Sequence, residues 1–440
     1  MKKKYLVLLF ALNSFYTNAQ VWSPLGNGMN SVVYCLQKDT VSDLLYAGGY
    51  FTTAGIANVH YIAKWNGASW LGLGTGFSNA VSSLTIYNGL LYAGGNFTAA
   101  GGSAGSNIAI WNGSAWSAVG TGAGMGGVSF TINTLAVYNN ELYAGGSFTS
   151  ADANAASHIA KWNGTVWSAV GSGMNADVKA LAVYNGELYA AGNFTTAGGI
   201  AANYIAKWNG TTWSTVGSGT NSLVSALAVF NNELYAGGTF VSAGSSTANY
   251  IAKWDGTNWQ SVGTGLGVGT YTSINALAVY SGKLFAGGYF TTAGGIPANN
   301  VASWNGVSWS PMGTGTDATV NTLAASNTCL YAGGQFTTAG GNATNSIAKW
   351  DPVAGINESL INNGLNVYPN PFSKQTVIEF EKEIESASVK IFSIEGKEIK
   401  SCSFSGKRLI IEKGELPAGV YLIKVISGKD LIADKKIIIQ

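Results

Sequence analysis

The fourteen tryptophans of this 440-residue chain fall into two interleaved series that share one period. Successive members of a series are 46 to 51 residues apart. The first series is Trp22, Trp70, Trp116, Trp167, Trp213, Trp259 and Trp309, and the second is Trp65, Trp111, Trp162, Trp208, Trp254, Trp304 and Trp350. A period near 50 residues is typical of solenoids, propellers and other repeat arrays. Seven copies of one unit therefore occupy residues 22–351.

The fourth copy indicates what one unit builds. Ala180–Tyr184 and Glu187–Ala190 are short, mostly apolar segments. They are separated by Asn185-Gly186, which favours a type I′ hairpin turn because both central residues need positive φ. Residues 204–216 repeat this arrangement around a second Asn-Gly pair. Two hairpins without helical periodicity predict a four-stranded antiparallel sheet, with a longer connection between the hairpins.

The two ends of the repeat region are complementary. The last copy ends after its third strand, at Trp350, and residues 21–26 have the pattern of a fourth strand with nothing before it. One small sheet cannot bury both of its faces, whereas sheets stacked radially in a β-propeller can. We therefore predict an all-β fold, a seven-bladed propeller over residues 20–351. Residues 21–26 are expected to complete the blade formed by residues 320–351, which removes an exposed sheet edge.

A glycine pair recurs in the second predicted strand of six copies. The pairs are Gly48-Gly49, Gly94-Gly95, Gly145-Gly146, Gly237-Gly238, Gly287-Gly288 and Gly333-Gly334, and the fourth copy has Ala191-Gly192. Glycine weakens a strand but permits close approach of another chain segment. We predict that neighbouring blades pack most tightly there.

The repeat has a recognisable signature in its second, third and fourth strands. In the fifth copy it consists of Leu234–Gly238, Ile251–Asp255 and Trp259. This pattern resembles the kelch repeat and its relatives among propeller repeats, over residues 21–351. The resemblance implies the fold but no single function, because kelch-like propellers include enzymes, adhesins and scaffolds.

The first residues have the composition of a secretory signal. Lys2, Lys3 and Lys4 precede the apolar segment Tyr5–Leu12, and small residues lie before Gln20, which predicts a signal peptide over residues 1–19. No apolar run is long enough to span a bilayer, so we expect no transmembrane segment. The formal net charge is only +2, so no basic field for nucleic acid is expected.

Charge density changes sharply near residue 352. Residues 20–351 carry 8 lysines and 10 acidic residues, whereas residues 352–440 carry 12 basic and 11 acidic residues in about a quarter of that length. Such a shift predicts a domain boundary. We assign residues 352–365 to a linker and residues 366–440 to a second domain. Alternating and apolar segments in that domain predict a small β-sandwich.

The second domain carries three ordered motifs. They are Asn366–Phe372, Ser388–Ser393 and Leu416–Val425, followed by a lysine-rich, apolar C-terminus. This region resembles the C-terminal sorting domain of type IX secretion cargo, and an ordinary Ig-like binding module is the alternative. The resemblance implies passage across the outer membrane of a Bacteroidota-type cell, with the type IX machinery as partner. The sorting-motif residues it implies are Tyr368, Pro369, Asn370, Pro371, Gly419 and Tyr421.

Catalytic and metal-binding patterns are sparse. The two histidines, His60 and His158, occupy variable positions, and we assign them to loops or strand edges. No cluster has metal-ligand spacing, so we predict no metal and no cofactor. Three acidic residues, Glu141, Glu187 and Glu233, share one position beside the first turn, which indicates a solvated rim.

The cysteines leave one alternative open. Cys35 lies in the first copy and Cys329 in the last, which become neighbours if the repeats close into a ring. A disulfide and two small buried thiols are both compatible with the sequence.

Candidate ligand-binding residues lie where the repeats differ. Copies three and six lengthen the loop before their first strand, and these loops carry Phe130 and Tyr271. Loop variation on a rigid scaffold is where function concentrates. Two acids, Asp177 and Asp317, lie in loops that enter the first strand, on the face where propellers bind ligands.

These features together predict a non-enzymatic protein that is secreted or on the outer cell surface and binds a glycan or a protein. The alternative is a secreted carbohydrate-active hydrolase or lyase that uses Asp177 or Asp317. A structural spacer without a small ligand is the third hypothesis.

Overall fold

The computed structural model describes residues 21–104, 107–120, 130–152, 154–267, 271–351, 365–393, 398–427 and 430–440. Residues Val21–Asp351 form one compact unit, and the C-terminal residues belong to another. Every described element is a β-strand. Within these ranges, no helix is long and apolar enough to cross a membrane. The predicted signal peptide and residues 352–364 of the predicted linker lie outside the described residues, and Leu365 begins a strand.

The first unit contains seven four-stranded antiparallel sheets in its described part. We number them in chain order, each as four strands from inside to outside. They are β2 (Val33–Lys38), β3 (Leu45–Gly49), β6 (Ile62–Trp65) and β7 (Trp70–Gly72); β8 (Val81–Tyr87), β9 (Leu90–Gly95), β12 (Ile108–Trp111) and β13 (Trp116–Ala118); β14 (Ile132–Tyr138), β15 (Glu141–Gly146), β18 (Ile159–Trp162) and β19 (Trp167–Ala169); β20 (Val178–Tyr184), β21 (Glu187–Gly192), β24 (Ile205–Trp208) and β25 (Trp213–Thr215); β26 (Val224–Phe230), β27 (Glu233–Gly238), β30 (Ile251–Trp254) and β31 (Trp259–Ser261); β32 (Ser273–Tyr280), β33 (Lys283–Tyr289), β36 (Val301–Trp304) and β37 (Trp309–Pro311); and β38 (Val320–Ala325), β39 (Leu330–Gly334), β42 (Ile347–Asp351) and β1 (Val21–Pro24).

The connection between the two hairpins of each sheet is more ordered than the sequence predicts, because it forms a small two-stranded ladder of its own. The ladders are β4–β5 (Thr53–Ala54, Ala57–Asn58), β10–β11 (Ala99–Ala100, Ser103–Ala104), β16–β17 (Ser150–Ala151, Asn154–Ala155), β22–β23 (Thr196–Ala197, Ile200–Ala201), β28–β29 (Ser242–Ala243, Ser246–Thr247), β34–β35 (Thr292–Ala293, Ile296–Pro297) and β40–β41 (Thr338–Ala339, Asn342–Ala343). The two turns of a sheet also differ. Asn185 and Gly186 both have positive φ, 48° and 74°, as a type I′ turn requires. In the second turn the Asn209 side chain instead accepts hydrogen bonds from the backbone of Thr211 and Thr212.

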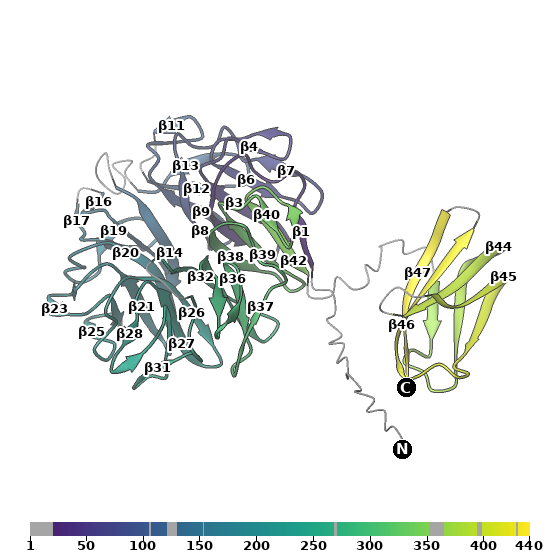
Figure 1. The fold of residues 1–440 in the computed structure, drawn as a ribbon. Coiled ribbons are helices and arrows are strands. Elements are labelled where there is room, and N and C mark those ends of the chain that lie inside the picture. The colour runs from purple at the N-terminus through teal and green to yellow at the C-terminus, as the bar shows by residue number, and fades with distance from the viewer. Residues whose placement is uncertain are drawn as a thin grey trace, which may run out of the picture. The chain divides into compact units, whose positions relative to one another are not determined.

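The sheets succeed one another radially, as in a β-propeller (Figure 1). Each innermost strand contacts the innermost strand of the next sheet, from β2 through β38, and β38 in turn contacts β2. The seventh sheet takes strands from both ends of the repeat region, since β1 pairs with β42 and Trp22 lies opposite Trp350. The indole N–H of Trp22 donates to the carbonyl oxygen of Met312 in the sixth sheet (3.0 Å). Trp22, in the first strand of the unit, therefore links the seventh sheet to the sixth.

The outer tryptophans link every sheet to the one before it. The indole of Trp213 in β25, for example, donates to the carbonyl oxygen of Val170, which follows the third sheet (2.9 Å). Trp259 bonds Val216 of the fourth sheet in the same way (2.9 Å). Within a sheet, the outer tryptophan also packs against its partner in the third strand. Each indole thus contributes buried area and a directed hydrogen bond to the junction.

Each glycine pair serves two different contacts. A Cβ atom on Gly237 would lie 2.6 Å from Cγ2 of Ile274 in the next sheet. A Cβ atom on Gly238 would lie 2.0 Å from the carbonyl oxygen of Leu223, within its own sheet. The predicted close packing between sheets is therefore confirmed for the first glycine and wrong for the second. The same contact joins the last sheet to the first, where Gly333 faces Val33.

Tyrosines at the ends of innermost strands connect successive first hairpins. The Tyr138 hydroxyl donates to the carbonyl oxygen of Gly186 (3.0 Å), and the Tyr184 hydroxyl donates to that of Asn232 (3.1 Å). The fifth sheet has Phe230 at this position, so its junction with the sixth sheet lacks this bond.

The C-terminal unit is a five-stranded antiparallel sheet. Its strands are β43 (Leu365–Tyr368), β44 (Gln375–Ser393), β45 (Glu398–Glu412), β46 (Gly419–Ser427) and β47 (Asp430–Ile439). The long strand β44 pairs with β43, β45 and β46, and β46 pairs with β47, so the five strands form one hydrogen-bonded sheet, and the predicted β-sandwich stays a prediction. Register shifts divide β44 into two halves, and Ile378 and Val389 from the two halves share one core cluster.

The sorting-motif residues lie beside the C-terminal strand of this unit. The Asn370 side chain accepts a hydrogen bond from the Ile438 backbone (2.7 Å), and the Phe372 amide donates to the Ile438 carbonyl oxygen (2.9 Å). Two further members of the motif set, Gly419 and Tyr421, lie in β46, which pairs with the same strand.

The two glycines of a pair should respond differently to substitution. Gly238→Ala is expected to destabilise the protein by roughly 1–3 kcal/mol, because the new methyl group meets a backbone oxygen that cannot move aside. Gly237→Ala should cost less, since Ala191 fills the equivalent position in the fourth sheet and packs with Val224. Urea unfolding of both variants measures the difference. Equal losses would contradict this assignment.

The tyrosine hydrogen bond that is absent at Phe230 can be introduced by substitution, and the equivalent hydrogen bond of Tyr184 can be removed. Phe230→Tyr should place a hydroxyl near the carbonyl oxygen of Gly282 and raise the free energy of unfolding by about 0.5–1.5 kcal/mol. The matched variant Tyr184→Phe should lower it by a similar amount. Urea unfolding of both proteins tests this, and a stabilising Tyr184→Phe would refute the role given to these hydroxyls.

Candidate functional site

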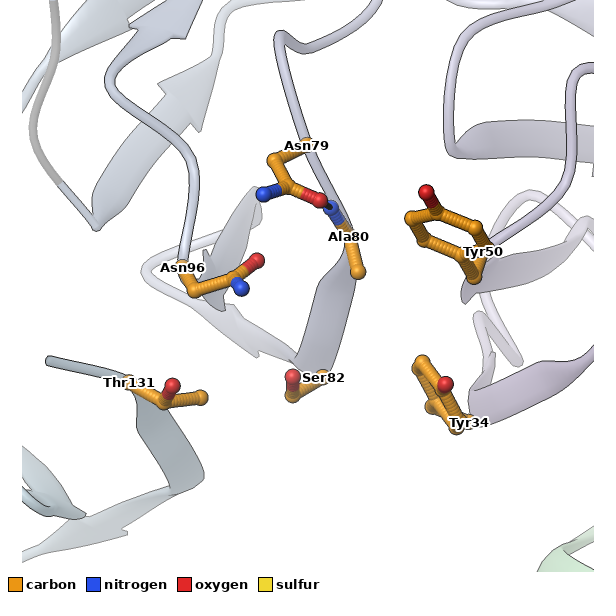
Figure 2. Close-up of a pocket in the computed structure, with 7 residues that line it drawn as sticks. All are labelled: Tyr34, Tyr50, Asn79, Ala80, Ser82, Asn96 and Thr131. Carbon is orange, nitrogen blue, oxygen red and sulfur yellow. Dashed lines mark hydrogen bonds between the residues drawn. The ribbon is translucent and has the colours of Figure 1, made fainter. Parts of the chain in front are cut away.

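A hollow of about 310 Å³ opens where the first three sheets meet (Figure 2). Its lining residues are Tyr34, Tyr50, Asn79, Ala80, Ser82, Asn96 and Thr131. A volume of this size falls at the lower end of the range of small-molecule sites. It is therefore our candidate functional site.

A backbone irregularity places two of these side chains. Val33 pairs with Gly49, but Cys35 pairs with Gly48, so Tyr34 is an extra residue in β2. Ser82 is the corresponding extra residue in β8. Such a β-bulge re-aims a side chain away from the ladder. Both bulged side chains consequently line the hollow.

The hollow has an aromatic wall. Tyr50 directly follows the glycine pair of the first sheet, is 53% exposed, and packs against Tyr61 with ring centroids 5.6 Å apart. Tyr34 is 39% exposed and lies on the same side in Figure 2. Both rings present apolar surface and a hydroxyl group to a ligand.

The facing wall carries unpaired polar groups. Asn96, Ser82 and Thr131 lie across the hollow from the tyrosines in Figure 2. Considering only the described residues, their side chains have no hydrogen-bond partner, and neither has the amide nitrogen of Asn79. None of the lining residues carries a charge. The arrangement suits an uncharged ligand that offers hydroxyl groups and an apolar face.

Sequence reasoning did not select these residues, although a signal was present. Tyr34 and Tyr50 replace the small polar residues found at the same positions of the second sheet, Ser82 and Asn96. Phe130, which was selected, directly precedes Thr131. Its half-buried ring packs in the core cluster of the second and third sheets, and its carbonyl oxygen accepts a hydrogen bond from Asn107. Phe130 is therefore next to the hollow only because its backbone leads into Thr131, whereas its ring belongs to the core.

The other candidate residues lie elsewhere. Tyr271 is 84% exposed at the start of the sixth sheet, three sheets away from Phe130, so the two are not brought together. Residues 121–129 and 268–270 of the two long loops lie outside the described residues. Asp177 forms an ion pair with Lys179 (3.1 Å) and lies 3.9 Å from Nδ1 of His158 in the neighbouring sheet.

Asp317 closes its own loop. Its carboxylate accepts hydrogen bonds from the backbone of Thr337 and Thr338, both at 2.9 Å, and from the Thr337 hydroxyl. Burial tends to raise the pKa of Asp317, but these hydrogen bonds together hold it below its usual value. Asn30 makes the same contacts to Thr52 and Thr53 in the first sheet. The position therefore has a structural role that an amide performs equally well.

The repeated glutamates are not the solvated rim that the sequence indicates. Glu187 pairs with Lys207 of β24 (2.8 Å), and only about a quarter of each side chain is exposed. Burial and then Glu187 raise the pKa of neighbouring Tyr189 to about 12. Equivalent ion pairs join Glu141 to Lys161 and Glu233 to Lys253.

Both cysteines of the repeat region are free and buried, so the disulfide alternative does not hold. Throughout the described ranges, no group of three or more His, Cys, Asp or Glu side chains could hold a metal ion.

Comparison with known families identifies both parts of the chain. Residues 366–440 match the secretion system C-terminal sorting domain. Residues 121–282 match the Rax2 C-terminal β-propeller domain, whereas the likeness to kelch repeats stays a prediction. The protein is therefore a β-propeller protein with a type IX sorting domain, and it is secreted or displayed at the cell surface.

Solved structures to which the chain is similar include PorZ, a bacterial surface component of the type IX secretion system of Porphyromonas gingivalis. It is 15% identical, with a TM-score of 0.45 and 95% of this chain covered. The extracellular domain of a putative hybrid two-component system from B. thetaiotaomicron is 10% identical, with a TM-score of 0.48 and 97% covered. The chain spans 60% of the length of each. No curated protein matches it.

Substitutions of Asp317 test whether its loop needs a charged side chain or only a hydrogen-bond acceptor. Asp317→Asn is expected to leave the melting temperature at neutral pH nearly unchanged, whereas Asp317→Ala should cost about 1 kcal/mol. A carboxyl with a depressed pKa stabilises the fold above its unfolded pKa and loses this effect as pH falls through its folded pKa. Calorimetry should therefore show a smaller acid-induced loss of stability for Asp317→Asn than for the wild type. Strong destabilisation of the asparagine variant at neutral pH would contradict this.

Proposed function

We propose that this protein is an exported cell-surface β-propeller that binds a neutral glycan in the hollow between its first three sheets. This proposal is based mainly on the unpaired amide and hydroxyl groups of Asn96, Ser82 and Thr131, which face two exposed tyrosines in a hollow with no charged residue among its described lining. Sugar rings present an apolar face that stacks on aromatic rings and hydroxyl groups that bond to amides.

The proposal includes a closed ring of seven blades that holds this site rigid. The circular contacts of the innermost strands, the pairing of β1 with β42 and the packing of Val33 on Gly333 support closure by the N-terminal strand. A site built across three blades needs such a scaffold, because a small displacement of one blade would separate the tyrosines from the facing amides.

A protein partner and a hydrolytic activity are less well supported. The hollow offers only Ala80 and the two tyrosines as apolar contacts, which gives a peptide side chain little to fill. Glycoside hydrolysis uses two carboxylates about 5–10 Å apart across the scissile bond. Asp177 and Asp317 precede the fourth and seventh sheets, and their partners are Lys179 and Thr337 rather than each other.

We further propose that the sorting-motif residues Tyr368–Pro371, together with β46 and β47, form the surface that the type IX machinery recognises. The family match over residues 366–440 and the hydrogen bonds between Asn370 and the C-terminal strand support this.

Glycan binding can be tested directly on the secreted protein. Isothermal titration against neutral polysaccharides should show binding that Tyr50→Ala and Asn96→Ala each weaken by about tenfold, as expected for loss of a stacked ring or a hydrogen-bonding amide. Asn193→Ala is the matched control, because Asn193 occupies the position of Asn96 in the fourth sheet, far from the hollow.

Two results would count against the proposal. One is a folded protein that binds no neutral polysaccharide. The other is binding that survives both substitutions at the hollow, or that Asn193→Ala weakens equally. Capture of a surface protein that competes at Tyr50 would favour the protein-partner alternative instead.

A further inference from the structure

A second hollow lies on the other side of the first sheet, at its junction with the seventh. It has a volume of about 550 Å³. Its lining includes Asn30, Ser31, Val32, Gln335, Thr337 and Ser346. Like the first hollow, it has polar walls, and none of the described residues that line it is charged.

The two hollows adjoin each other. Tyr50 lines the first hollow and Val32 lines the second. The Tyr50 backbone amide donates a hydrogen bond to the Val32 carbonyl oxygen (2.9 Å), so the two linings meet at this backbone contact.

One repeat position extends from these hollows to the sixth sheet. The residue after the glycine pair is Tyr289 in the sixth sheet, Gln335 in the seventh, Tyr50 in the first and Asn96 in the second. These four sheets are consecutive, since β32 contacts β38, β38 contacts β2, and β2 contacts β8. Tyr289 is 49% exposed, nearly as much as Tyr50. The remaining sheets carry Ser147, Asn193 and Thr239 at this position.

An arc of alternating aromatic and amide side chains thus spans four consecutive sheets and contains both tyrosines found at this position, whereas the other three sheets carry serine, asparagine and threonine there. A single sugar would occupy one hollow and leave the rest of the arc unused. A linear chain that runs along the arc would meet Tyr289, Gln335, Tyr50 and Asn96 in turn, and each ring or amide would add a contact.

We propose that this arc is an extended cleft for a linear, uncharged polysaccharide chain, which lies across the sixth, seventh, first and second sheets. The inference rests on the proposed function and extends it from one sugar-sized site to a chain. Gln335 and Tyr289 are then positions that select for chain length, and neither is part of the first hollow.

Titration with cello-, laminari- and manno-oligosaccharides of increasing length tests this. In the series that binds, affinity should rise by about tenfold from the disaccharide to the hexasaccharide, as one additional stacked ring would provide. The double variant Gln335→Ala/Tyr289→Ala should remove this gain and leave disaccharide binding unchanged. Asn193→Ala, at the same repeat position on the opposite side, should alter neither.

The outcomes separate the two proposals. Affinity that stops rising at the disaccharide would overturn the extended cleft but not the first hollow, and so would a double variant that binds the hexasaccharide like the wild type. A double variant that weakens disaccharide and hexasaccharide equally would also overturn the cleft, because the two residues would then not act through chain length. Failure of all three series to bind would overturn the glycan function together with this inference.

Discussion

The repeated junction between neighbouring sheets is the contact on which the remainder of the structure depends. It combines a β-branched side chain seated on a glycine with an indole that donates a hydrogen bond to the preceding sheet. Ile274 on Gly237 and Trp309 on Val262 form the set between the fifth and sixth sheets, and Val33 on Gly333 with Trp70 on Leu25 form the set between the seventh sheet and the first. Neither face of a single sheet is buried without its neighbours, so order in one sheet requires the junctions on both sides.

Because the glycine and tryptophan positions hold the sheets together, other positions of the repeat are free to vary. The bulged residue of the innermost strand and the residue after the glycine pair lie outside this repeated contact, although the bulged Asn133 and Asn321 each donate a hydrogen bond to the next sheet. Tyr34 and Tyr50 occupy these positions in the first sheet, and Lys179 and Asn193 occupy them in the fourth. Binding chemistry can therefore change from sheet to sheet while the packing stays constant.

The same distinction explains what the sequence predicted. Strands, the type I′ turn at Asn185-Gly186 and the pairing partner of Trp22 follow from periodicity, because repeated packing leaves a repeated pattern. The position of Tyr34 does not follow, since a bulge is a local shift of hydrogen bonding that periodicity does not reveal. Asp317 was selected for its charge, yet Asn30 in the equivalent loop accepts the same backbone hydrogen bonds without one.

The charge distribution unites the two units in one account of function. Many charged side chains of the propeller form local ion pairs, such as Lys207 with Glu187. The described residues that line both hollows carry no charge. A site of this kind gains nothing from long-range steering and must rely on contact area and directed hydrogen bonds. Such contacts are individually weak, so useful affinity requires several of them on one ligand. A protein carried outside the cell by its sorting domain meets polymers that offer many identical units, and an arc of repeated side chains matches that property.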